Sequence, residues 1–265
     1  MQRTILITGS TDGIGLEAAK MLAAAGHEVL LHGRSRAKLD AAAQTIAEQS
    51  RREGIETFVA DLARLDDVER LVGQIVERSA PLDVLINNAG ILKAPEPITA
   101  SGMDIRFVVN TLAPYLLAKQ LMPVMNPDGR IVNVSSAAQA SVQPEAMMGR
   151  TQVGDMAAYA QSKLALTMWS RQMAEEIGPD GPAVIAVNPG SLLASKMVKE
   201  GFGVAGNDLS IGAEILTCAA ISDDFKDASG RYFDNDAGRF GSPHRDALDP
   251  DKVTAIVRLI EETVA

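Results

Sequence analysis

The chain has 265 residues, 46% of them hydrophobic, which is enough for one large α/β domain with a sizeable core. Its formal net charge of −9 argues against nucleic acid or an anionic membrane surface as a partner. One cysteine excludes an internal disulfide, three widely separated histidines give no metal-ligand spacing, and no apolar run is long enough for a membrane span. The N-terminus enters an apolar run without a signal-peptide pattern, which favours a cytoplasmic enzyme or binding protein.

Apolar segments alternate along the chain with helix-forming segments. Strands are predicted over residues 3–8, 28–33, 55–60, 82–87, 129–136 and 183–188. Helices are predicted over residues 14–26, 36–53, 66–80, 102–125 and 157–177. Near-continuous apolar strands between helices indicate a parallel sheet covered on both faces. The sequence therefore predicts an α/β fold, a single doubly wound, Rossmann-type parallel sheet, in one domain over residues 1–265.

A glycine-rich loop, TGSTDGIG, joins the first predicted strand directly to the first predicted helix. Gly9 would permit a tight turn, Gly13 would let the backbone approach a phosphate, and Gly15 would let the helix pack closely on the strand. The free N–H groups at the start of the helix would then face a pyrophosphate. A Walker A loop is excluded because no Gly-Lys-Ser/Thr follows. The loop is thus predicted to bind a dinucleotide through Gly9, Ser10, Thr11, Asp12, Gly13, Ile14 and Gly15.

The residues after the second predicted strand bear on the choice of cofactor. An acidic residue here would accept the ribose hydroxyls of NAD, but the chain has Arg34 and Ser35. The guanidinium of Arg34 can pair with a ribose 2′-phosphate and stack on adenine. We therefore expect NADP(H), with NAD(H) as the alternative. Asp12 is a counter-signal, and an ordinary arginine at a helix entry is the other interpretation of Arg34.

Tyr159 and Lys163 stand four residues apart on the last predicted helix, so they share one face of it. A lysine cation close to the phenol would lower its pKa from the usual value of about 10 and make Tyr159 a usable general acid or base. The spacing alone is weak evidence, because most such pairs are a surface tyrosine and a solvated lysine.

Together, these features resemble the short-chain dehydrogenase/reductase family over residues 4–190. The matching motifs, in order, are TGSTDGIG, Asp61-Leu62, NNAG at 87–90, Asn110, VNVSS at 132–136, YAQSK at 159–163 and NPG at 188–190. Because several motifs occur in the right order, the tyrosine–lysine pair is interpreted as catalytic, which its spacing alone does not support.

The resemblance implies a role for each matched position. Ser136, rather than its neighbour Ser135, would orient the substrate oxygen. Tyr159 would be the general acid in reduction and the base in oxidation, and Lys163 would hold the nicotinamide ribose and lower the tyrosine pKa. The other cofactor contacts that the resemblance implies are Asp61, Leu62, Asn88, Ala89, Gly90, Pro189 and Gly190.

Asn110 has a physical argument of its own. Pro114, four residues later, has no N–H to give to the carbonyl of Asn110. A freed buried carbonyl needs another donor, such as a water. In the resembled family this asparagine holds a water that relays protons to the lysine; a simple helix kink is the alternative.

The chain also departs from the commoner family pattern. The stretch between Ser136 and Tyr159 is longer, and this insertion at 137–157, like the C-terminal region, is similar to the retinol-dehydrogenase-like branch. Ser191 or Ser195 replaces the threonine that usually follows Pro-Gly. The glycine-punctuated segment around 191–210 is predicted to be a mobile substrate lid. We expect the insertion, with Met147, Met148 and Met156, and the lid to enclose an apolar pocket; plain loop packing of the methionines is the alternative.

These inferences predict an NADP(H)-dependent oxidoreductase, such as a carbonyl reductase, that acts on a small-molecule, apolar carbonyl or alcohol without a metal. A non-catalytic dinucleotide sensor, a dehydratase or epimerase, and a serine hydrolase are the alternatives, although the hydrolase motif G-x-S-x-G is missing. Helices 102–125 and 157–177 have apolar faces that could pair in a homodimer or homotetramer. Cys218 lies in an apolar helical run and is interpreted as a core residue.

Overall fold

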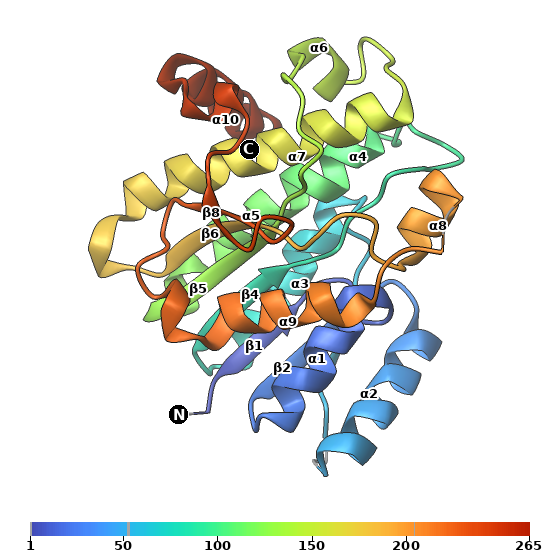
Figure 1. Cartoon of the computed structure of the whole chain (residues 1–265), viewed down its shortest axis with the longest axis vertical. Helices are drawn as coiled ribbons and strands as arrows, with labels where there is room; N and C mark the ends of the chain where they lie inside the picture. Colours follow the sequence, from blue (N-terminus) through green and yellow to red (C-terminus); the bar gives the residue numbers. More distant parts are fainter. Residues whose placement is uncertain (1, 52–53, 204) are drawn as a thin grey trace.

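An eight-stranded sheet runs through the centre of the protein (Figure 1). The computed structural model describes residues 2–51, 54–203 and 205–265. The strand order is β3-β2-β1-β4-β5-β6-β7-β8, and every pair is parallel except β7 with β8. The strands are β1 (Thr4–Ile7), β2 (Glu28–Gly33), β3 (Thr57–Val59), β4 (Leu82–Asn87), β5 (Met125–Val134), β6 (Ala183–Asn188), β7 (Tyr232–Asp234) and β8 (Arg239–Gly241).

Helices cover both faces of this sheet and bury two separate apolar cores. One face carries α1 (Gly13–Ala24), α2 (Arg36–Ser50) and α9 (Leu209–Ile221). The other carries α3 (Leu65–Glu77), α5 (Ala113–Leu121), α7 (Asp155–Ile177) and α10 (Pro250–Val264). The shorter helices are α4 (Ile105–Phe107), α6 (Pro144–Met147) and α8 (Lys196–Phe202). The predicted doubly wound parallel sheet is therefore confirmed, because buried strands of this kind need an apolar cover on each side.

All six predicted strands are present, and the predicted helices lie between them. The predicted helix 36–53 ends at Ser50, followed by Arg51 in the left-handed conformation; residues 52 and 53 lie outside the described part. No sequence pattern predicts β7, β8 or α10, and of α9 only the apolar helical run around Cys218 is predicted. The two strands have three residues each, too short for a periodic pattern to stand out.

The C-terminal helix α10 changes the interpretation of the apolar faces on α5 and α7. Ile256 and Ile260 of α10 are buried in the same core cluster as Trp169 of α7. The Tyr115 hydroxyl of α5 donates a 2.8 Å hydrogen bond to Glu261 of α10. Part of the surface that we expected to be free for subunit pairing is thus covered by the chain's own C-terminus.

Two other expectations about apolar residues are wrong. Met147 of α6, which is part of the insertion, is fully buried in the core and lies outside the set of residues that line the cavity described below, as the alternative of plain packing predicts. Cys218 of α9 is exposed, because it falls on the outer side of a helix whose inner side carries the core. Within the described residues, no helix combines the length and apolar character needed to cross a bilayer.

Candidate active site

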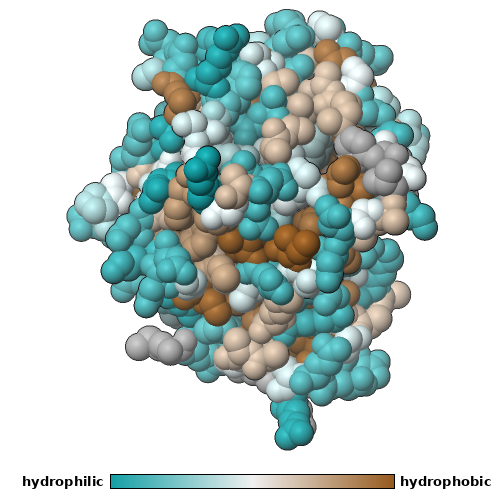
Figure 2. All heavy atoms as spheres, in the orientation of Figure 1, coloured by the Kyte–Doolittle hydropathy of each residue, from teal (hydrophilic) through white to brown (hydrophobic). Residues whose placement is uncertain are grey.

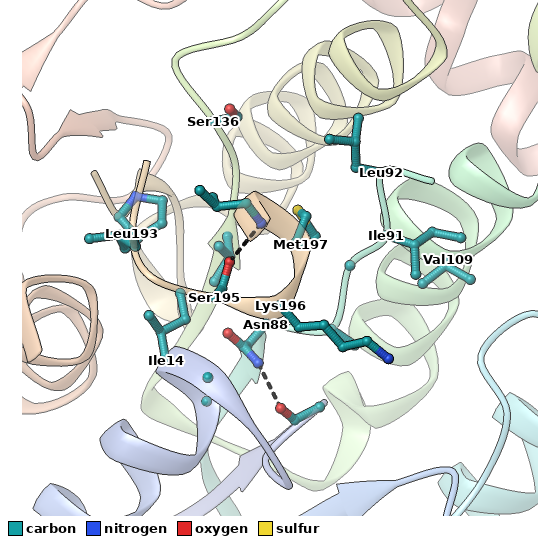
Figure 3. A pocket seen from close by; sticks show the side chains of 18 of the residues that line it. Ile14, Asn88, Ile91, Leu92, Val109, Ser136, Leu193, Ser195, Lys196 and Met197 are labelled. Atoms are coloured by element: carbon teal, nitrogen blue, oxygen red, sulfur yellow. Dashed lines mark hydrogen bonds between the residues drawn. The ribbon is translucent and has the colours of Figure 1, made fainter. Parts of the chain in front are cut away.

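A cavity of about 650 Å³ lies at the carboxyl ends of the central strands. This edge of an open parallel sheet is where ligands bind in doubly wound folds. In Figure 2, apolar atoms gather in a hollow near the middle of the face in view, and Figure 3 shows residues that line the cavity. Of the predicted site residues, these line it: Gly9, Thr11, Asp12, Gly13, Ile14, Gly15, Arg34, Asp61, Leu62, Asn88, Ala89, Gly90, Ser136, Tyr159, Lys163, Pro189 and Gly190.

The glycines of the TGSTDGIG loop are held too tightly for side chains. Gly9 has a φ of +65°, and a Cβ there would lie 3.0 Å from the Cα of Ala89. A Cβ on Gly15 would lie 2.5 Å from the carbonyl oxygen of Gly9. Asp12 caps α1 by accepting a 2.7 Å hydrogen bond from the Gly13 N–H, so its carboxylate belongs to the helix start rather than to a ribose site. The loop leaves bare backbone at a helix N-terminus, which fits a pyrophosphate.

Ser10 lies behind the loop, outside the set of residues that line the cavity. It is fully buried, and its hydroxyl accepts a 3.0 Å hydrogen bond from the backbone N–H of His32. His32 in turn accepts a 3.2 Å hydrogen bond from the Gly9 N–H at Nδ1, and its Nε2 lies 3.1 Å from the carbonyl oxygen of Ala60. Burial lowers the pKa of His32 to about 4, so the ring is neutral near pH 7 and can accept this bond. Ser10 and His32 thus hold the TGSTDGIG loop, called the phosphate loop below, against β2.

Asn88 has a similar supporting role from the end of β4. Its side-chain amide donates hydrogen bonds of 2.8 and 3.1 Å to the carbonyl oxygens of Thr8 and Gly9. The hydroxyl of Thr8 accepts from the backbone N–H groups of Asn88 and Ala89, each at 3.0 Å. The NNAG segment therefore fixes the phosphate loop and continues along the cavity.

Two cations stand at the β2 end of the cavity. Arg34 and Lys38 are both exposed and both line it, as does the Asp61-Leu62 segment. Ser35 caps α2 by accepting from the Lys38 N–H at 3.4 Å, and it lies outside the lining, so its hydroxyl serves the helix start rather than the cavity. Lys38 was missed because a lysine in a charged, exposed helix has no distinguishing pattern. Its place in the first helical turn, beside Arg34, could have suggested it.

Ser136, Tyr159 and Lys163 meet at the other end of the cavity. The Ser136 side chain lies close enough to the Tyr159 hydroxyl to lower the pKa of that phenol. The Lys163 ammonium lies 5.8 Å from the centre of the Tyr159 ring and donates a 2.6 Å hydrogen bond to the carbonyl oxygen of Val134. Ser135, the rejected alternative, is buried and bonds at 2.7 Å to the Thr167 hydroxyl.

The electrostatics of this pair differ from the sequence-based expectation. Burial raises the pKa of Tyr159, and the opposing contribution comes from the hydrogen bond of Ser136 rather than from Lys163. Burial also lowers the pKa of Lys163 to about 8. Desolvation dominates both groups because each buried charge loses its contact with water.

Asn110 lies behind the cavity in a π-helical turn, residues 108–112, that ends just before Pro114. Its side-chain amide donates to the carbonyl oxygen of Ile91 at 2.9 Å and to the Ser162 hydroxyl at 3.0 Å, and its oxygen accepts from the Ile91 N–H at 2.8 Å. A Cβ on Gly90 would lie 3.3 Å from Asn110 Oδ1 and 3.4 Å from Lys163 Nζ. The structure thus brings Asn110 close to Lys163, at a break in the regular helix.

Apolar side chains line the cavity beside Ser136 and Tyr159. They come from the loop after β4, the helical segment 105–112, the insertion, the loop after β6 and α8: Ile91, Leu92, Ile105, Val109, Ala138, Met156, Leu193, Met197 and Val198. In Figure 3, Ile91, Leu92 and Val109 lie together on one side of the cavity, with Met197 of α8 next to them. Of the three methionines of the insertion, only Met156 is part of this lining. The sequence pointed to the lid and to Met156, but no motif marked the residues near 91 and 109.

The structure separates the two serines after Pro-Gly. The Ser191 hydroxyl donates a 2.6 Å hydrogen bond to Asp236. Ser195 caps α8, and a Cβ on Gly13 would lie 3.9 Å from the Ser195 Cβ. Ser195 therefore lies close to the start of α1.

Comparisons with known proteins agree with this geometry. The family model for short chain dehydrogenases matches residues 3–202. Human retinol dehydrogenase 13 is 29% identical over 253 residues, 88% of this chain and 76% of the relative. Human polyprenol dehydrogenase is 30% identical over 254 residues, 88% of this chain and 77% of the relative.

Solved structures are similar as well. A protein from Mycobacterium paratuberculosis has a TM-score of 0.81 at 27% identity, over 99% of this chain and 93% of that one. A short chain dehydrogenase from Shigella flexneri, complexed with NADP, has a TM-score of 0.70 at 28% identity, over 88% of this chain and 97% of that one. The chain belongs to the short-chain dehydrogenase/reductase family of oxidoreductases, in the branch that includes retinol dehydrogenase-like proteins.

Proposed function

We propose that the protein is an NADP(H)-dependent oxidoreductase that interconverts a carbonyl and an alcohol on an apolar substrate. One observation carries this proposal: a single cavity contains the bare phosphate loop at one end and the Ser136, Tyr159 and Lys163 side chains at the other. A bound dinucleotide would supply the hydride in reduction and accept it in oxidation, and an extended cofactor would reach from the glycine-rich loop to the three side chains.

The phosphate end of the cavity favours the phosphorylated cofactor. Arg34 and Lys38 put two positive charges at the β2 end, where a ribose 2′-phosphate would bind. The similar structures from Shigella flexneri and Burkholderia cenocepacia were determined with NADP. The carboxylate of Asp12, which argued for NAD in the sequence, is taken up by capping α1.

The residues of the chain would divide the proton chemistry among them. Ser136 would donate a hydrogen bond to the substrate oxygen, and Tyr159 would give that oxygen its proton in reduction or take it in oxidation. Lys163 would hold the cofactor ribose. The buried side chains of Asn110 and Ser162 would keep Lys163 in a polar environment through which protons could be replaced.

The apolar lining would select the substrate and exclude water. Ile91, Val109 and Met197 offer no charged partner, so an aliphatic or isoprenoid carbonyl or alcohol would fit this end of the cavity better than a sugar or an acid. Residues 191–210, which include α8, would act as the lid over it.

Tyr159→Phe tests the mechanism. Turnover of a panel of aliphatic and aromatic ketones, aldehydes and alcohols is measured by NADPH absorbance, and cofactor binding is measured by fluorescence. We expect the variant to bind NADPH like the wild type but to lose turnover by at least about 100-fold. Tyr115→Phe, which removes a buried hydroxyl outside the cavity lining, is the matched control. A Tyr159→Phe variant as active as this control would refute the mechanism, and a wild type that binds NADPH but turns over no substrate would favour a sensor.

A further inference from the structure

The β7–β8 hairpin, residues 232–241, lies against two loops of the active site although it follows the segment that the family model matches. The Tyr232 hydroxyl donates a 3.1 Å hydrogen bond to the carbonyl oxygen of Ser136. At the other loop, the Asn235 amide donates to the carbonyl oxygen of Pro189 at 2.9 Å, and Asp236 accepts from the Ser191 N–H at 2.8 Å. The hairpin therefore touches the backbone of both loops that border the reacting end of the cavity.

The direction of the Ser136 hydroxyl depends on its own backbone. Its oxygen accepts a 3.1 Å hydrogen bond from the Ala138 N–H, two residues later. A lone pair of the hydroxyl is thus committed to the loop, and its proton is left for Tyr159 or for a substrate oxygen. A small rotation of the 136–138 turn would therefore redirect the proton.

Two side chains hold the carbonyl of that same serine. Gln139 Nε2 donates to it at 2.9 Å, beside the Tyr232 hydroxyl. The side-chain oxygen of Gln139 accepts a 3.2 Å hydrogen bond from the His244 N–H. The Ser136 carbonyl therefore has two side-chain donors, and one of them, Gln139, is itself held by the backbone at His244.

Tyr232 is buried and fixed in place, which suits a residue that acts on the Ser136 backbone rather than on a substrate. Its side chain is only 5% exposed, and it lies outside the set of residues that line the cavity. Burial raises its pKa, so the phenol keeps the proton that it donates. Its position is fixed by the parallel pairing of β7 with β6, where Tyr232 stands next to Ala186.

We propose that Tyr232 is a positioning residue whose hydroxyl, together with Gln139, holds the Ser136 carbonyl and so sets the direction of the Ser136 hydroxyl toward the substrate oxygen. This inference rests on the proposed function, in which Ser136 binds that oxygen. The competing explanation is that the hydroxyl of Tyr232 only stabilises the fold.

Tyr232→Phe in the full-length protein separates the two explanations, because it removes one oxygen and keeps the ring packed. We expect kcat to fall about tenfold, the value of one well-placed hydrogen bond, while KM and NADPH affinity stay within about twofold. The alkaline rise of the oxidation rate should move to higher pH, because a misdirected Ser136 no longer lowers the pKa of Tyr159. Tyr115→Phe is the control, since it also removes a buried hydroxyl with a hydrogen-bond partner. Equal kcat values and equal pH profiles for the two variants would overturn the inference.

A double-mutant cycle with Ser136→Ala gives the second test. If Tyr232 acts through Ser136, Tyr232→Phe has no further effect on kcat in the Ser136→Ala background. If Tyr232→Phe lowers kcat by the same factor in the Ser136→Ala background as in the wild type, the inference is overturned. Hydrogen–deuterium exchange over residues 135–141 is a readout independent of turnover, and we expect faster exchange in Tyr232→Phe but not in Tyr115→Phe. If Ser136→Ala keeps wild-type turnover, the proposed function of Ser136 fails; if it loses turnover while Tyr232→Phe behaves like the control, only this inference fails.

Discussion

Arg106 in α4 forms an ion pair with Asp155, the first residue of α7. Arg106 is 2% exposed and also holds Asp104 with a 2.8 Å hydrogen bond. Asp155 stands one helical turn before Tyr159, near the end of the insertion at 137–157. The pair therefore ties the start of the helix that carries the tyrosine to the helix that precedes Asn110.

Asp155→Asn should loosen this end of α7 without leaving Arg106 unpaired. We expect the free energy of unfolding to fall by about 1–2 kcal/mol, as for loss of one charged hydrogen bond, and kcat to fall with NADPH affinity unchanged. Urea denaturation and steady-state kinetics measure the two effects. Asp251→Asn is the matched control, because Asp251 also lies in the first turn of a helix, α10. Equal losses of stability and kcat in the two variants would mean that the carboxylate acts through the helix dipole and that the ion pair with Arg106 has no role of its own.

Lys38 should contribute to the choice of cofactor together with Arg34. Lys38→Ala is expected to weaken NADPH binding by about three- to tenfold and to leave NADH binding unchanged, since only the 2′-phosphate gains from the cation. The difference should shrink as salt is added, because both side chains are exposed. Fluorescence titration with each cofactor measures it. Arg36→Ala, an exposed cation that bonds to Thr57 at 2.9 Å, is the control. A similar loss for both cofactors in Lys38→Ala would contradict the assignment.

His32 should make the stability of the protein depend on pH. Its pKa is lowered from 6.5 to about 4 in the folded chain, so the unfolded chain binds the proton more tightly. The stabilisation is complete above pH 6.5 and is lost as the pH falls toward about 4, and its full size is about 3 kcal/mol. Urea denaturation at several pH values measures it.

His32→Asn is the comparison that isolates this effect, since its amide oxygen can accept from the Gly9 N–H but does not titrate. We expect the variant to be less stable at pH 7 but to lose less stability between pH 6.5 and 4 than the wild type. Parallel pH profiles of the two proteins would show that His32 does not titrate as its burial implies.

Gly206 tests the lid. It has a φ of +81°, and a Cβ there would lie 2.6 Å from the Cα of Ala194, next to the bridge between Leu193 and Asn207. Gly206→Ala should therefore open this contact and raise substrate KM by up to about tenfold, from strain of about 1–3 kcal/mol.

Gly203→Ala is the control for this variant. Gly203 also has a positive φ, +69°, but among the described residues no neighbouring atom lies within 4 Å of the place that its Cβ would take. Steady-state kinetics and limited proteolysis of residues 191–208 compare the two variants. Equal changes in KM and in proteolysis for the two variants would show that the positive φ alone causes them. The contact between residue 206 and Ala194 would then have no role in the lid.

Local patterns along the chain were enough to define the sheet and both ends of the site. Near-continuous apolar runs between helices can be buried only as parallel strands, so the six central strands and their helices could be predicted. Gly9, Gly13 and Gly15 could be recognised because bare backbone at a helix start has few other uses. Tyr159 and Ser136 could be singled out because they belong to ordered local motifs.

The supporting residues of these motifs became apparent only in the folded chain. Ser10, Ser35 and Asp12 are predicted cofactor contacts, but the folded chain engages their side chains with β2, α2 and α1 respectively, and of the three Asp12 alone lines the cavity. A local motif does not show which of its polar groups the backbone will use.

Long-range contacts account for the features of the site that the sequence does not predict. Tyr232 is 96 residues from the serine whose carbonyl it holds, and Arg106 is 49 residues from the start of α7. No periodicity or spacing links such pairs, because they meet only when the sheet has brought distant segments to one edge. For the same reason the raised pKa of Tyr159 could not be read from its distance to Lys163 along the helix: desolvation depends on everything packed around the site.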